Sequence, residues 1–204
     1  KEAVLSTMAL LEAESELKTL RRLCDNGRFT VEANDMSAVR LLSERKTPFV
    51  LGTGINVYSD RTLRVLAGLG AKRWVMPVEL SRQTLALIQA GRPEGVETEV
   101  FAYGRLPLAY SARCFTARHH NLPKDDCQYR CLDDPEGLVL STREGQAFLA
   151  INGVQTQSAQ TCNLLAELAD LRELKVDVLR LSPQADATEA VVQAFAACLR
   201  GQGN

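Results

Sequence analysis

The segment Arg73–Gly104, "RWVMPVELSRQTLALIQAGRPEGVETEVFAYG", contains one complete unit of the predicted fold. It opens with an apolar run typical of a buried strand, and Ser81 follows as the candidate N-cap of a helix that ends near Ala90. The glycines and proline of "GRPEG" end this helix, and a second strand begins at Glu97. A strand, a helix and a strand in this order predict two parallel strands joined by a helical crossover.

The same alternation runs through most of the chain. Short apolar strands are predicted at residues 3–7, 29–35, 47–56, 73–80, 97–104 and 176–182. Helices are predicted at residues 10–24, 36–44, 60–70, 82–90 and 164–174, and a last helix is predicted to begin with Thr188 as its cap. Asp35 and Ser59 are further candidate caps. The alternation stops after residue 104, where "LVLS" and "AFLAING", residues 138–141 and 147–153, predict a hairpin.

Six strands with intervening helices predict an α/β protein with a TIM-barrel-like (βα) repeat. A closed barrel has eight strands, so we expect the first two to be missing. Because the chain begins with Lys1 and not with Met, we expect it to be part of a larger protein. We interpret residues 1–204 as a single incomplete barrel domain, with residues 105–150 as an insertion that carries a cysteine loop and the hairpin. An open doubly wound sheet is the alternative, although the glycines of Gly52–Gly54 lack the third glycine of a dinucleotide-binding loop.

The composition argues against several classes of function. The net charge is -1 and no basic stripe is present, so no nucleic-acid partner is expected. No apolar run approaches the roughly 18 residues of a membrane-spanning helix, and no signal peptide opens the chain. We therefore expect a cytoplasmic location, where cysteines stay reduced and clustered thiols bind metal more often than they form disulfides.

Polar side chains follow several predicted strands, at the positions where barrel enzymes collect their functional groups. Glu32, Asn56, Glu79 and Arg180 are the candidates for a small-molecule pocket. The alternative for these residues is an internal salt bridge or a solvated rim. The spacing of the chain suggests no Ser-His-Asp or Cys-His set, so the sequence assigns no catalytic residue.

Three of the six cysteines lie in one polar segment, "ARCFTARHHNLPKDDCQYRC", residues 112–131. They are Cys114, Cys127 and Cys131, and the spacing of the last two suits one helical turn with both sulfurs on the same face. Thiolates are soft ligands that suit zinc or an iron–sulfur cluster. Free or packing thiols are the alternative interpretation of this segment.

Both kinds of metal site usually need four ligands. Cys162, His119 and His120 are candidates for the fourth, and so is a residue outside this chain. Cys24 and Cys198 lie on apolar helix faces and are predicted to belong to the core.

Four motifs resemble members of the collagenase-like peptidase family that act in ubiquinone biosynthesis. The motifs are "MPVELS" at residues 76–81, "YGRLPLAYSARCFTAR" at 103–118, "PKDDC" at 123–127 and "VLRLSP" at 178–183. The resemblance runs in order along essentially the whole chain and is densest from Tyr103 to Cys131. It implies a TIM-barrel-like fold without its first two strands, in agreement with the strand count.

The resemblance also implies a cofactor and a partner. Proteins of this kind hold a [4Fe-4S] cluster through four cysteines, three of which match Cys114, Cys127 and Cys131. The fourth lies in an N-terminal segment that we expect to be absent from this chain. They act as a heterodimer with a sister protein of the same family, in the oxygen-independent hydroxylation of a ubiquinone precursor. The implied role is therefore that of a component of an anaerobic hydroxylase.

Peptidase activity is not expected, because the chain departs from the signature of the broader family. That signature is Glu-x-Phe-x-x-Gly, followed by a small residue, an aliphatic residue and a cysteine. Glu99, Phe101 and Gly104 fit it, whereas Arg105 takes the small position and Pro107 takes the cysteine position. Two other functions stay open: an RNA-hydroxylating enzyme of the same broad family, and a zinc-stapled interaction module without catalysis.

Overall fold

The computed structural model describes residues 2–123 and 126–201. The chain divides into two compact units, and each is described by itself. Unit 1 consists of Lys1–Val100 and Asp170–Leu179, and unit 2 consists of Phe101–Ala169 and Arg180–Asn204. The predicted insertion at residues 105–150 lies inside unit 2.

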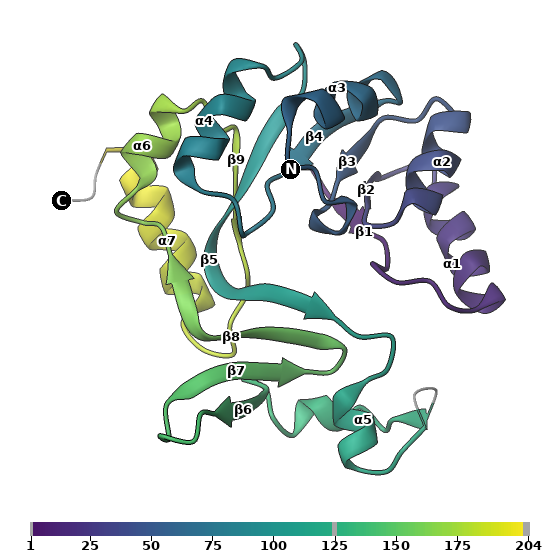
Figure 1. Cartoon of the computed structure of the whole chain (residues 1–204), viewed down its shortest axis with the longest axis vertical. Helices are drawn as coiled ribbons and strands as arrows, with labels where there is room; N and C mark the ends of the chain where they lie inside the picture. Colours follow the sequence, from purple (N-terminus) through teal and green to yellow (C-terminus); the bar gives the residue numbers. More distant parts are fainter. Residues whose placement is uncertain (1, 124–125, 202–204) are drawn as a thin grey trace. The chain divides into compact units, whose positions relative to one another are not determined.

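The first half of the chain alternates strands and helices, as labelled in Figure 1. In chain order the elements are β1 (Val4–Ser6), α1 (Glu14–Cys24), β2 (Thr30–Ala33), α2 (Met36–Glu44), β3 (Phe49–Leu51), the 3-10 turn η1 (Thr53–Ile55), α3 (Asp60–Gly68), β4 (Ala71–Val75), α4 (Arg82–Ala90) and β5 (Glu97–Tyr110). Near the C-terminus α6 (Leu168–Glu173) and β9 (Val178–Leu181) repeat the pattern.

The first five strands pair in the order β1-β2-β3-β4-β5, which is their order in the chain, and every pairing is parallel. Strand β9 also pairs with β5. The backbone N–H groups of Asp177 and Ser182 donate to the carbonyl oxygens of Thr98 and Tyr103, at 3.0 and 2.8 Å, so β9 runs parallel to β5. Parallel strands that follow chain order are typical of a (βα) barrel, whereas a doubly wound sheet reverses direction from its first strand. The prediction of an α/β, TIM-barrel-like fold is confirmed.

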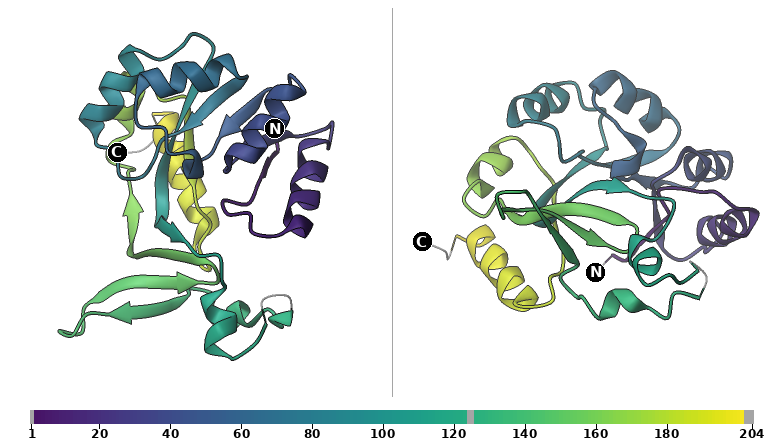
Figure 2. Two further views of the ribbon diagram at one scale, coloured as in Figure 1. Left: turned by 45° about the vertical axis from the view of Figure 1, so that its right-hand side comes forward. Right: turned by 60° about the horizontal axis from the view of Figure 1, so that its bottom comes forward.

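The two faces of the parallel strands differ in chemistry. One face lies under helices α1 to α4 (Figure 2) and carries the core side chains Val31, Phe49 and Trp74, each at most 1% exposed. The other face carries a row that crosses β2 to β5 in register, namely Glu32, Val50, Arg73 and Glu97. The buried apolar side chains of one face make the strands predictable from the sequence. The charged residues of the other face interrupt the apolar runs and keep them short.

Arg73 joins three carboxylates on the polar face. Its guanidinium lies 2.9 Å from Glu2, 2.7 Å from Glu97 and 3.8 Å from the buried Glu99. The hydrogen bond from Arg73 lowers the pKa of Glu2. Burial acts to lower the pKa of Arg73, but its bonds to Glu2 and Glu97 outweigh this effect and the net shift is upward. Both shifts favour the charged forms of Glu2 and Arg73, so these two groups pair as ions at neutral pH.

Three helices begin at the predicted caps. Asp35 accepts a hydrogen bond from the N–H of Ser37 at 2.7 Å, and Ser59 and Ser81 each accept one from the residue three positions on, at 3.2 Å. The prediction for α7 (Thr188–Leu199) is wrong by one residue, because Ala187 is the N-cap. The hydroxyl of Thr188 bonds instead to the backbone of Gln184, in the loop that precedes the helix.

Unit 2 contains an antiparallel sheet in the order β5-β8-β7-β6, with β6 (Leu138–Ser141), β7 (Ala147–Asn152) and β8 (Gln155–Asn163). The predicted hairpin is confirmed, since β6 and β7 pair with Leu138 opposite Ile151. Strand β8, "QTQSAQTCN", is not predicted, because its alternating polar residues resemble a loop. Its backbone nevertheless pairs with β5 on one side and β7 on the other.

The extension of β5 beyond Gly104 is also not predicted. Pro107, which has no N–H to donate, lies between two register shifts in the pairing of β5 with β8. The hydroxyl of Ser158 accepts the N–H of Leu106 at 2.9 Å, so a side chain replaces a missing ladder bond at this bulge.

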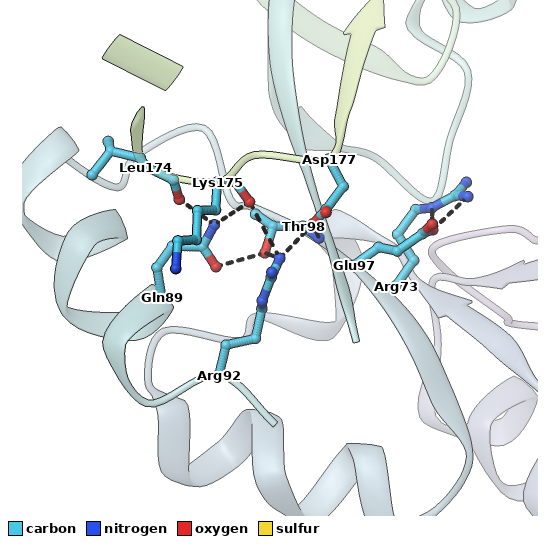
Figure 3. A network of polar contacts seen from close by, with 8 residues as sticks. All are labelled: Arg73, Gln89, Arg92, Glu97, Thr98, Leu174, Lys175 and Asp177. Carbon is cyan, nitrogen blue, oxygen red and sulfur yellow. Dashed lines mark hydrogen bonds and ion pairs between the residues drawn. The ribbon is translucent and has the colours of Figure 1, made fainter. Parts of the chain in front are cut away.

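A polar network joins α4, β5 and the residues before β9 (Figure 3). The hydroxyl of the fully buried Thr98 donates to Gln89 at 2.9 Å and accepts from Arg92 at 3.0 Å. The Thr98 N–H donates to the carboxylate of Asp177 at 2.8 Å, and Arg92 pairs with the same carboxylate. The amide of Gln89 donates to the carbonyl oxygen of Leu174 at 2.8 Å. The network is centred on Thr98, whose hydroxyl contacts Gln89 and Arg92 and whose backbone N–H contacts Asp177.

We predict that Thr98→Val lowers the free energy of unfolding by about 1–3 kcal/mol, because it removes two hydrogen bonds of a buried hydroxyl, the one donated to Gln89 and the one accepted from Arg92. Urea unfolding followed by the fluorescence of the single tryptophan, Trp74, measures the loss. Thr19→Val is the matched control, since its hydroxyl bonds to the carbonyl of Ser15 at an exposed site. Equal effects of the two substitutions would contradict the prediction.

Candidate functional site

The three clustered cysteines all lie in unit 2, between β5 and β6. Cys114 is the N-cap of the short helix α5 (Phe115–His119), and its Sγ accepts a hydrogen bond from the N–H of Ala117 at 3.4 Å. Cys131 lies in the 3-10 turn η3 (Arg130–Leu132). Cys127 precedes that turn. All six cysteines of the chain are free thiols, and these three are half-buried.

The backbone between Cys127 and Cys131 differs from the prediction. Gln128 and Tyr129 both have a positive φ of 53°, so the chain reverses its helical sense before η3 begins. The two thiols are therefore not on one regular helical turn, and the prediction on this point is wrong. A C-x3-C spacing fits a helix turn only when the intervening residues are themselves helical, and here they form a left-handed turn.

Helix α5 holds Cys114 against the antiparallel sheet. The N–H of Phe115 donates to the carbonyl of Gly153 at 2.9 Å, and the N–H of Gly153 donates to the hydroxyl of Thr116 at 3.2 Å. Thr116 and Ala117 are buried, at 3% and 2% exposed. Helix α5 also packs against η3, which carries Cys131. The elements that carry the first and last thiol of the segment are thus neighbours.

The arrangement of ligands is nevertheless incomplete. Within residues 2–123 and 126–201, no group of three or more His, Cys, Asp or Glu side chains is placed to hold a metal ion. The donor chemistry suits a soft metal or an iron–sulfur cluster, because three free thiols lie in one segment. The geometry of the described residues does not suit it, because the three thiols are not grouped around one point.

The candidates for a fourth ligand lie in different settings. His119 and His120 are exposed, and their rings meet edge to face with centroids 5.1 Å apart. Cys162 is on β8 opposite Gly104, and burial raises the pKa of its thiol. Cys24 is buried in α1, as predicted, and burial raises the pKa of its thiol too. Cys198 on α7 is only half-buried, so it lies at the edge of the predicted core.

Glu32 is buried in a closed polar network at the carboxyl ends of β1 and β2. Its carboxylate accepts from the hydroxyl of Ser6 at 3.2 Å and from the amide of Asn34 at 3.3 Å. The Asn34 amide also donates to Ser6 and to the carbonyl of Thr7, at 2.9 and 3.0 Å, and the Asn34 backbone N–H donates to the Thr7 hydroxyl at 2.9 Å. Asn34 organises this network, although the sequence analysis did not single it out.

A glycine signal in the sequence points to Asn34. A Cβ on Gly52 would lie 1.9 Å from the Asn34 Oδ1, and a Cβ on Gly54 would lie 2.4 Å from the Asn34 carbonyl oxygen. The two glycines of "GTG" therefore leave room for Asn34 instead of forming a phosphate loop. Gly52 and Gly54 follow β3, and Asn34 follows the neighbouring strand β2. The contact between these residues was predictable from this pattern.

The other pocket candidates do not share the setting of Glu32. Asn56 is exposed and has a positive φ of 56°, which ends η1. Glu79 is exposed and accepts a hydrogen bond from the Tyr58 hydroxyl at 3.5 Å. Burial, and then the charge of Glu79, raise the pKa of Tyr58. Arg180 is half-buried in β9 and belongs to unit 2, whereas the other three belong to unit 1. A pocket role for these four residues stays a prediction.

The fold and the thiol segment define a TIM-barrel-like α/β protein with a candidate soft-metal segment in an antiparallel insertion. The family model for peptidase family U32 matches residues 3–200, so the chain belongs to this family. No solved structure matches the chain. In the described ranges, each helix is too short or too polar to cross a bilayer.

We predict that Gly52→Ala lowers the free energy of unfolding by about 1–3 kcal/mol, because the new methyl group displaces the Asn34 amide from its buried partners. Gly68→Ala is the control, since Gly68 is an exposed residue of α3 with open space around its Cβ position. It should be neutral or stabilising by up to about 1 kcal/mol. Urea unfolding measures both changes, and a Gly52→Ala protein as stable as wild type would show that the network is loose.

Proposed function

We propose that this chain is a UbiV-like subunit that binds a [4Fe-4S] cluster and takes part in oxygen-independent hydroxylation during ubiquinone biosynthesis. The proposed partner is a UbiU-like sister subunit, in a heterodimer. The observation that carries the proposal is a set of three free, half-buried thiols, Cys114, Cys127 and Cys131, in one segment of a family U32 chain. The four motifs that resemble ubiquinone-biosynthesis proteins favour this branch of the family. Reduced thiols fit a cytoplasmic location.

A cofactor is needed for this role on chemical grounds. Hydroxylation without dioxygen requires electron or oxygen-atom transfer that side chains alone cannot supply, and an iron–sulfur cluster supplies electron transfer. The residues proposed to hold it are the three thiols. The N–H of Ala117 already donates to the Cys114 sulfur, which is a contact that tunes the potential of sulfur-ligated iron.

The charges of the segment are compatible with several thiolates. Arg113 and Arg118 are exposed and flank Cys114 on either side. Arg130 pairs with Asp133 at 3.2 Å next to Cys131. Cations near thiolates offset their negative charge, although the acidic residue here reduces that effect.

Cluster binding requires Cys127 and Cys131 to approach Cys114. In the described part of the segment between α5 and β6, residues 120–123 and 126–137, the backbone forms turns, such as the bond from the Leu132 N–H to the Tyr129 carbonyl at 2.9 Å, and no strand. Such turns rearrange at a lower cost than a strand in a ladder. We therefore assign the movement to this segment and keep α5 fixed on the sheet.

A peptidase function is not proposed, in spite of the family name. The position of the family's cysteine is occupied by Pro107, which lies at the bulge of β5 and offers no nucleophile.

We predict that Cys114→Ser, Cys127→Ser and Cys131→Ser each remove most of the bound iron and sulfide from full-length protein purified without oxygen together with its UbiU-like partner. The reason is that serine replaces a soft thiolate ligand with a harder and less acidic hydroxyl group. Iron and sulfide analysis and the visible absorption spectrum measure the loss.

Cys198→Ser is the matched control, because Cys198 is also a half-buried free thiol of unit 2 but lies on α7, outside the segment. It should retain the iron of wild type. Full iron content and an unchanged spectrum in all three segment variants would end the proposal. Zinc without iron or sulfide in the wild-type protein would favour a structural metal module instead.

A further inference from the structure

Strand β6 forms one edge of the antiparallel sheet of unit 2 (Figure 1). It pairs with β7, and among the described residues no strand pairs along its other side. An edge strand presents a row of backbone N–H and C=O groups to which another strand can bond. Protein sheets usually block such an edge with a charged residue, a proline or a bulge.

Strand β6 carries none of these blocking features. Its sequence, Leu-Val-Leu-Ser, contains neither a charged residue nor a proline. The register shift in the hairpin falls between Leu140 and Ser141, and the extra residue is Phe148 on β7, so β6 itself stays regular. Val139 and Leu140 are 50% and 47% exposed. The edge is therefore regular, apolar and accessible to a further strand.

The backbone of Val139 points toward this open edge. The N–H of Thr142 donates to the carbonyl of Gln146 at 2.8 Å, so Thr142 faces the β7 side of the hairpin. Backbone groups alternate in direction along a strand, so Leu140 also faces β7, whereas Val139 and Ser141 face outward. Neither Val139 nor Ser141 makes a backbone hydrogen bond outside the sheet with another described residue.

We propose that two copies of this protein associate through β6, as antiparallel strands related by a twofold axis at Val139. In this register the two Val139 residues exchange N–H and C=O groups, and Leu138 of one copy lies opposite Leu140 of the other. The Ser141 N–H of each copy then meets the Gly137 carbonyl of the other. A second copy is the occupant that the sequence favours, because the strand is complementary to itself and no like charges meet along it.

The leucines favour an axis at Val139 over the neighbouring register. An axis at Leu140 would place Leu138 of one copy opposite Thr142 of the other, so fewer apolar side chains would pair. A strand of this length buries little surface, so we expect a weak dimer that forms as the concentration rises. The cysteines do not lie on β6, and the pairing is therefore independent of the proposed function.

Sedimentation velocity of the full-length protein, without a partner subunit and with its thiols kept reduced, tests this pairing from micromolar to millimolar concentrations. The wild-type protein should pass from monomer to dimer. Val139→Lys and Val139→Glu should each weaken the dimer about tenfold or more, because like charges would face each other across the axis. An equimolar mixture of the two variants should dimerise about fivefold or more tightly than either alone, because opposite charges then meet.

Phe148→Lys is the matched control, because it removes an apolar side chain that is 62% exposed on the same hairpin but does not lie on the edge strand. It should leave the dimer unchanged. Wild-type protein that stays monomeric at millimolar concentration would overturn the proposal, and so would dimers that Phe148→Lys abolishes and Val139→Lys preserves. A mixture of Val139→Lys and Val139→Glu that stays monomeric would overturn the axis at Val139. None of these results bears on iron content, so the pairing and the cluster proposal fail separately.

Discussion

The pairing of strand β5 is the constraint on which the rest of the structure depends. Its first residues pair parallel with β4, with Val75 opposite Glu99, and its later residues pair antiparallel with β8, with Tyr103 opposite Asn163. Because side chains alternate along a strand, this register places Glu97 and Glu99 on the face of Arg73 and leaves Thr98 on the helix-covered face with Gln89. A slip of one residue would bury carboxylates under α4 and expose the hydroxyl that bonds to Gln89 and Arg92.

Strand β5 also supports the part of unit 2 that carries the polar residues and the cysteines. Gly104 and Arg105 pair with Cys162 and Thr161 of β8, and β8 in turn pairs with β7, against which α5 packs. Cys114 is thereby attached to a sheet through α5, whereas Cys131 lies in η3, a 3-10 turn that packs against α5.

The elements that could be predicted from the sequence are those whose positions require a particular kind of residue, such as an apolar residue in a buried strand or a serine at a helix cap. The six parallel strands and their helices follow from apolar runs such as Phe49–Leu51, buried on both sides, and from caps such as Ser81 that a helix start requires. The polar strand β8 could not be predicted, because its stability comes from backbone pairing with neighbours and not from its own side chains. The thiol segment could be identified from its composition. Its left-handed turn could not be predicted, because the two residues with a positive φ, Gln128 and Tyr129, are not glycines.

We propose that the thiol segment, Cys114 to Cys131, holds an iron–sulfur cluster. Its most direct test is the metal content of wild-type, full-length protein purified without oxygen with its UbiU-like partner, combined with iron X-ray absorption. We expect equal amounts of iron and sulfide, with iron bonded mainly to sulfur. Zinc in place of iron, or protein that stays free of metal after anaerobic reconstitution with iron and sulfide, would contradict it.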